Sequence, residues 1–162
     1  ADLNHRHHDT HRLQARFFAR LDAASLYFGL DMESSSEEGQ GDEERNAFIE
    51  WLTDPANDSW LNEVVCNQNL SICDIRKEGS FQGTIMSVGG KWCLSNGEGE
   101  EKEIESLPNF LNELTDSARL DLRIYKTVKK GDVMTRGAGI ADDIAGLFEK
   151  LLPVYEATVA IF

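Results

Sequence analysis

The side chains best suited to hold an anion occupy a short basic segment in the last quarter of the chain. They are four cations and two glycines: Lys126, Lys129, Lys130, Arg136, Gly137 and Gly139. Backbone N–H groups of a glycine-rich helix start bind phosphate, and nearby cations add charge. A dinucleotide fingerprint would need a third glycine where Asp142 stands, and the P-loop lysine is absent. We expect either a tight turn beside solvated cations or a modest contact to an anion or a nucleic acid.

A second group of cations, Arg12, Arg16 and Arg20, lies near the start of the chain. The carboxylates of Asp31 and Glu33 are expected to lie opposite this group and to neutralise much of its field. A chain of net charge −13 must concentrate its cations to attract phosphate within a Debye length of about 8–10 Å. We therefore favour the basic segment as the anion contact and keep the arginine face as the secondary candidate.

The chain carries no pattern that predicts a catalytic centre, a metal site or a cofactor site. Four histidines precede the first apolar segment: His5, His7, His8 and His11. Without a thiolate partner or an H-E-x-x-H spacing, residues 1–13 are interpreted as a flexible extension or linker. Asp142, Asp143 and Glu149 suggest acid–base chemistry, but the adjacent carboxylates of Asp142 and Asp143 point in different directions on a helix. Nucleophile elbows and deaminase signatures are missing. The expectation is a protein without enzymatic activity, with an enzyme of unrecognised site left open.

Composition narrows the setting of the protein. Acidity speaks against a broad phosphate-binding surface, although local basic patches can exist on an acidic domain. Residues 33–44 hold six carboxylates and no cation, which predicts a mobile acidic loop or, alternatively, a tether for a basic partner. Cys66, Cys73 and Cys93 are interpreted as buried free thiols in the cytoplasm, since C-x-x-C spacing is absent. No apolar run is long enough to cross a bilayer.

A β-hairpin over residues 14–33 is the element whose geometry the sequence defines best. Pairing about Ala23-Ala24 places Phe17 opposite Leu30, and it places alternate apolar residues on one face. On the other face Arg16 meets Asp31 and Arg20 meets a tyrosine. A slip of one residue would move the apolar row into water, so the register is well specified. The pattern predicts that five apolar side chains are buried: Phe17, Leu21, Leu26, Phe28 and Leu30.

The remaining periodicities predict an α+β fold. Apolar residues recur at helical spacing in four segments, namely 47–52, 57–65, 106–114 and 140–155. Strands are predicted over Leu70–Arg76, Phe81–Val88, Lys91–Ser95 and Leu120–Thr127, with Gly89-Gly90 as a hairpin turn. Pro153 is expected to kink or split the last helix. The expected architecture is one domain, residues 14–162, with a mostly antiparallel mixed sheet and helices packed on one face.

Two parts of this pattern resemble the DNA-recognition domain of McrB-type restriction systems. One is the hairpin core, Arg16-Phe17-Phe18-Ala19-Arg20 returning through Leu26-Tyr27-Phe28-Gly29-Leu30-Asp31. The other is the order of a helix (Leu107–Leu114), a strand (Leu120–Tyr125), a polar loop and a helix ending Leu151-Leu152-Pro153-Val154-Tyr155. The resemblance covers about a third of the chain and implies a non-catalytic module that reads modified bases in DNA. This chain departs from it in its acidity and in the loop 33–44.

These observations lead to two functional hypotheses from different classes. The first is a non-catalytic recognition or accessory module of a larger intracellular system, such as a restriction or defence protein, with DNA as the partner. The second is an acidic protein-interaction or inhibitor module that mimics DNA toward a basic protein. Neither hypothesis involves a membrane, and the sequence does not fix the oligomeric state.

Overall fold

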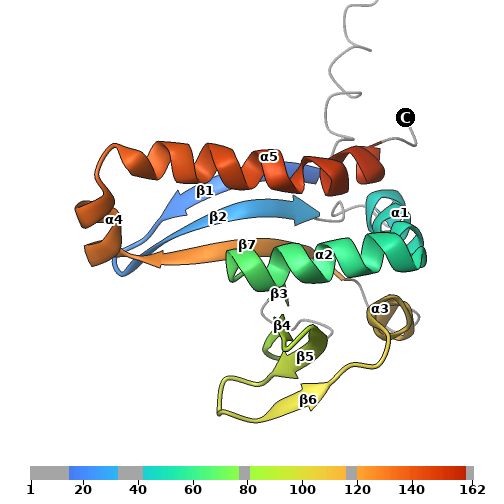
Figure 1. Ribbon diagram of the computed structural model, residues 1–162. Helices are drawn as coiled ribbons and strands as arrows, with labels where there is room; N and C mark the ends of the chain where they lie inside the picture. The colour runs from blue at the N-terminus through green and yellow to red at the C-terminus, as the bar shows by residue number, and fades with distance from the viewer. Residues whose placement is uncertain (1–14, 33–41, 77–80, 116–119, 160–162) are drawn as a thin grey trace, which may run out of the picture.

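Seven antiparallel strands form one sheet in the part of the chain that this computed structural model describes, residues 15–32, 42–76, 81–115 and 120–159. Their order across the sheet is β1-β2-β7-β3-β4-β5-β6, as Figure 1 shows. The strands are β1 (Ala15–Leu21), β2 (Ser25–Met32), β3 (Ser71–Asp74), β4 (Thr84–Val88), β5 (Lys91–Ser95), β6 (Glu101–Glu103) and β7 (Leu122–Lys129). The predicted α+β fold class is thus confirmed. In the sheet, β7 lies between the N-terminal hairpin and the strands from the middle of the chain.

The β1–β2 hairpin has the predicted register. Phe17 lies opposite Leu30, Arg16 opposite Asp31, and Arg20 opposite Tyr27. Its turn is set by Asp22, whose Oδ1 accepts hydrogen bonds from the backbone N–H groups of Ala24 and Ser25. These bonds lower the pKa of Asp22, so the carboxylate keeps its charge and the turn keeps its acceptor.

Burial along the hairpin follows the prediction on β2 and departs from it on β1. Leu26, Phe28 and Leu30 are buried, and Phe17 is half-buried against the rings of Phe148 and Tyr155. The prediction for Leu21 was wrong, because its side chain is 63% exposed. Leu21 ends an edge strand at the turn, beyond the part of β1 on which Phe148 and Tyr155 pack, whereas β2 has a neighbour on both sides.

Helices cover one face of the sheet (Figure 1). They are α1 (Asp42–Leu52), α2 (Pro55–Gln68), α3 (Leu107–Thr115), α4 (Lys130–Arg136) and α5 (Gly139–Val159). α5 lies over β1 and β2 through the contact of Phe148 with Phe17. α2 lies over β4 and β5, where the Ser87 hydroxyl donates to Asn62 and Trp92 Nε1 donates to Asp58. The residues that bind these helices alternate with those of the opposite face.

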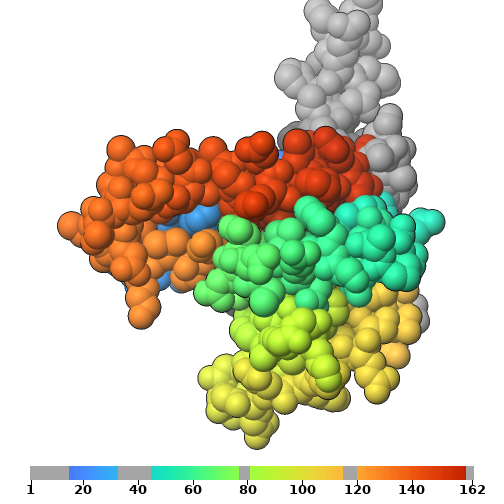
Figure 2. Space-filling model, in the orientation of Figure 1, coloured from blue at the N-terminus to red at the C-terminus, as the bar shows by residue number. Residues whose placement is uncertain are grey.

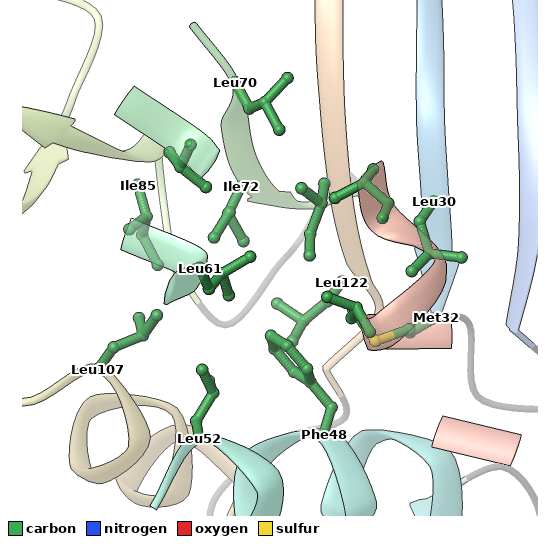
Figure 3. Close-up of a cluster of buried hydrophobic side chains, with 14 of the residues drawn as sticks. Leu30, Met32, Phe48, Leu52, Leu61, Leu70, Ile72, Ile85, Leu107 and Leu122 are labelled. Carbon is green, nitrogen blue, oxygen red and sulfur yellow. The ribbon is translucent and has the colours of Figure 1, made fainter. Parts of the chain in front are cut away.

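The buried side chains form one cluster between the sheet and the helices (Figure 3). Leu30 and Leu122 come from neighbouring strands, and Phe48 and Leu61 reach them from α1 and α2. Each such side chain contributes roughly 1.5–3 kcal/mol by leaving water. Trp92 belongs to this cluster, and Trp51 and Trp60 pack against it half-buried.

Several local predictions are corrected. Residues 42–44 belong to α1 rather than to the acidic loop, whose other residues lie outside the described ranges. The second helix begins at Pro55 with Asp54 as its N-cap, two residues before the start of the predicted segment 57–65. α5 continues through Pro153 without being split, and β6 and α4 occupy segments that were expected to be loops. The Ser106 hydroxyl oxygen accepts a hydrogen bond from the Asn109 N–H at the start of α3.

Two surface properties complete the description. Cys66 is exposed and Cys73 half-buried, so the prediction of three buried thiols holds for Cys93 alone; all three are free. Among the described helices, none combines the length and the apolar character that a bilayer crossing requires.

Gly29 offers a test of the β2–β7 pairing. A Cβ at this position would lie 2.0 Å from the Ile124 carbonyl oxygen and 2.7 Å from the Tyr125 Cα. Because these are backbone atoms, Gly29→Ala should lower the free energy of unfolding by about 3 kcal/mol, measured by urea denaturation. The control is Gly146→Ala in α5, where a Cβ meets nothing within 4 Å. The free energy of unfolding of that variant should rise by about 0.5–1 kcal/mol. Equal urea midpoints for the two variants would contradict the close approach of the backbones at Gly29.

Candidate nucleic-acid interface

The face of the sheet opposite the helices gathers cations and aromatic rings on β1, β2 and β7. Strand alternation and the observed register place these side chains together. We call them the open face: Arg16, Phe18, Arg20, Tyr27, Asp31, Arg123, Tyr125 and Lys129. In the described part of the chain, Phe17, Ser87 and Trp92 contact the helices from the other face of the sheet.

An ion pair anchors the centre of the open face. Arg123 Nε donates to Asp31 Oδ1 at 2.6 Å and Nη2 donates to Oδ2 at 2.9 Å. The guanidinium carbon of Arg123 also lies 4.2 Å from the ring centroid of Phe18. Asp31 is only 1% exposed, so its charge is held by a bidentate partner within the sheet. Arg123 therefore offsets the carboxylate that was expected to neutralise the hairpin arginines.

Two tyrosines from neighbouring strands lie beside this ion pair. The ring centroids of Tyr27 and Tyr125 are 6.3 Å apart with planes tilted by 51°, and both rings are half-buried. Cys73 of β3 lies opposite Arg123 in the register, on the same face. Burial raises the pKa of Tyr125 to about 12 and that of Cys73 to about 11. Both groups are neutral at physiological pH and present polar but uncharged surface.

The structure brings together cations that the sequence analysis assigned to separate sites. Arg20 lies opposite Tyr27, and Lys129 lies opposite Ser25 on the other side of β2. The backbone N–H of Lys130 donates to the Ala24 carbonyl at 2.9 Å, which ties the end of β7 to the hairpin turn. Arg20 and Lys129 therefore share one end of the open face, with the exposed Lys130 beginning α4 beside them.

Other members of the predicted basic segment lie elsewhere. Lys126 alternates to the helix side, where it lines a hollow of about 440 Å³ between the sheet and α5. Figure 2 shows this hollow, through which part of the blue hairpin is visible. Arg136 is bound by Asp143 at 2.8 and 2.9 Å, which raises the pKa of Arg136 and lowers that of Asp143. Arg12 lies outside the described residues.

The two glycines of the segment form a helix junction. Gly137 ends α4 with φ +57°, and its N–H donates to the Val133 carbonyl. A Cβ at Gly139 would meet the Arg136 guanidinium at 2.9 Å, so that side chain fills the space beside the start of α5. This is the tight turn of the first alternative, and the glycine donors are not gathered with Lys129 on the open face.

A second, acidic hollow of about 450 Å³ lies between α2 and the β5–β6 edge. Asp58, Glu63, Glu103 and Glu105 are among the side chains that line it. Asp58 accepts the Trp92 indole N–H, and Glu103 lies 3.4 Å from the Lys91 ammonium. Asp58 and Glu103 are therefore engaged in contacts within the fold. Among the described residues no group of three or more His, Cys, Asp or Glu side chains could hold a metal ion, and the four histidines lie outside those residues.

Sequence reasoning missed Phe18, Tyr27, Arg123 and Tyr125 as site residues. The signal for each was present, because alternation in the strand Leu120–Thr127 sets Arg123 and Tyr125 apart from the apolar row. What the sequence did not reveal was that this strand pairs with the hairpin.

Thiol reactivity tests the environment of Cys73. With a pKa of about 11, about one Cys73 side chain in a thousand is a thiolate at pH 8, whereas Cys66 is exposed. Iodoacetamide should label Cys66 of the folded protein first, and the labelling rate of Cys73 should be at least ten-fold lower. Peptide mapping measures both rates. Cys66→Ser should remove the fast phase; rapid labelling of Cys73 in that variant would show that the thiol is not held as described.

Comparisons of the chain with protein-family models, with curated proteins and with solved structures found no match. The resemblance to McrB-type recognition domains therefore stays a prediction. Any functional assignment rests on the geometry of the open face.

Proposed function

We propose that this chain is a non-catalytic recognition module that binds nucleic acid through the open face. The observation that carries the proposal is that Arg20 and Lys129, from distant parts of the sequence, lie on the same face of the sheet as Tyr27 and Tyr125. Cations position phosphates, and aromatic rings contact bases. A sheet surface that combines both suits a ligand with a charged backbone and flat, apolar faces.

The electrostatics support a confined site. Strands lie about 4.8 Å apart, so β1 and β7 are separated by about 10 Å across β2. That separation is close to the Debye length at physiological salt, so the fields of Arg20 and Lys129 add over the open face. Within β1, β2, β3 and β7, Asp31 is the carboxylate that alternation places on this face, and Arg123 offsets it. Attraction is therefore local on a chain whose net charge is −13.

The setting follows from the resemblance and from the thiols. We place the module in a larger restriction or defence protein, where it reads modified cytosine in DNA and other domains supply catalysis. Three free cysteines fit the reducing cytoplasm.

A second candidate function is favoured by the distribution of carboxylates at the other end of the sheet. Exposed acidic side chains gather on β6 and the preceding loop: Glu98, Glu100, Glu101 and Glu103. Together with Glu63 of α2 they form a surface suited to a basic protein partner. This surface and the open face are separated by β3, β4 and β5, so one module can carry both.

Charge reversal on the open face tests the proposed function. The combined substitution Arg20→Glu and Lys129→Glu should weaken binding to a DNA duplex at least ten-fold at low salt. It should also reduce the salt slope by about two, because two phosphate contacts are lost. Fluorescence anisotropy measures both quantities, with duplexes that carry modified or unmodified cytosine and single strands of the same sequence.

The matched control is Lys102→Glu on β6, an exposed lysine at the opposite edge of the sheet. Its binding should equal that of the unmodified protein. Failure of every nucleic acid to bind, with capture of a basic protein instead, would favour the acidic-surface function.

A further inference from the structure

The shape of the open face restricts the form of nucleic acid that fits it. A duplex presents its bases as edges inside grooves, which admit an α-helix or a two-stranded ribbon. The open face is part of a seven-stranded sheet, and its aromatic side chains belong to the inner strands β2 and β7 as well as to the edge strand β1. A surface this broad cannot enter a groove of B-form DNA, so its rings cannot reach bases that remain paired.

The aromatic and planar groups of the open face are arranged as a platform. Tyr27 and Tyr125 lie 6.3 Å apart between centroids, and Phe18 carries the Arg123 guanidinium at 4.2 Å. Gly29 lies between Phe18 and Tyr125 across the strands, so no side chain of β2 rises between these two rings. Unpaired bases stack on aromatic rings and on arginine planes, and each stack strengthens binding about ten-fold or more.

We propose that the open face binds unpaired bases of a single-stranded nucleic acid, stacked on Tyr27, Tyr125 and the Arg123 guanidinium, with phosphates beside Arg20 and Lys129. This inference rests on the proposed function and adds the form of the ligand. In a protein that reads modified DNA, the base is thereby recognised where it is not paired.

The platform is held in place before any ligand arrives. Asp31 fixes the plane of the Arg123 guanidinium with two hydrogen bonds, and the Tyr125 side chain is half-buried in the sheet surface. Preorganised groups lose little side-chain entropy when a ligand binds. The surface runs from the row of Arg123 to the row of Lys129, six residues along β7, or about 20 Å. That length accommodates several nucleotides in an extended strand.

The test compares single strands with duplexes of the same sequence. Probes of about ten nucleotides, containing modified or unmodified cytosine, match the size of sites that bind single strands. Fluorescence anisotropy at low salt should show that the single strand binds at least ten-fold more tightly than the duplex. Tyr27→Leu and Tyr125→Leu should each weaken single-strand binding by about ten-fold and leave the salt slope unchanged.

Tyr27→Phe and Tyr125→Phe are the matched controls, because they keep the rings and remove the hydroxyls. These variants should bind within a factor of two to three of the unmodified protein, and thermal unfolding followed by circular dichroism verifies that each variant is folded. Weak binding by a folded Phe variant would assign the contact to the hydroxyl and overturn stacking.

The outcomes separate the inference from the proposed function. Equal or tighter binding of the duplex, or Leu variants that bind single strands as well as the unmodified protein, would overturn the inference. The proposed function would still stand if Arg20→Glu with Lys129→Glu weakened duplex binding. Absence of binding to either form of nucleic acid would overturn both.

Discussion

The pairing of β2 with β7 is the constraint on which the rest of the molecule depends. Asp31 and Arg123, which face each other across this seam, are 92 residues apart in the chain. Closing so long a loop costs entropy that local contacts do not offset. Gly29 permits the two backbones to approach, and the apolar rows of both strands become continuous on the helix side. β1 is attached through β2 and β3 through β7, so the sheet and the open face both form around this seam.

The Arg123–Asp31 ion pair determines the register of the β2–β7 pairing more than it stabilises that pairing. Burying a carboxylate costs several kcal/mol, which the bidentate contact offsets only in good geometry. A slip of one residue would separate the charges and leave Asp31 buried without its partner, a loss of about 3–5 kcal/mol. The ion pair therefore raises the free energy of the wrong registers strongly and lowers that of the native register only slightly. The same contact holds the guanidinium over Phe18, so the ion pair that sets the register also belongs to the proposed recognition surface.

Sequence reasoning succeeded where the interactions are local. The hairpin register followed from alternation about one turn, and Gly89-Gly90 formed the predicted two-residue turn, both with positive φ. Leu21 failed because alternation reports which face a side chain takes, not how far a helix from another part of the chain extends over it. The split of Lys126 from Lys129 was likewise fixed by strand parity, but β7 was predicted to end at Thr127 and continues to Lys129. The candidate site needed the β2–β7 pairing, which no local pattern reveals.

The uneven distribution of charge on the chain favours one orientation of an approaching polyanion. Asp31 is bound by Arg123, and Oδ1 of Asp22 accepts two backbone hydrogen bonds in the turn. Among the described residues, exposed carboxylates gather on β6 and line the hollow beside α2. A polyanion approaching those surfaces is repelled, while one approaching the open face meets the summed field of its cations. Electrostatic complementarity of this kind contributes more to the choice and orientation of a partner than to affinity. Net charge and ligand charge of the same sign are thus compatible, provided that the cations lie on one face and the carboxylates there are already bound.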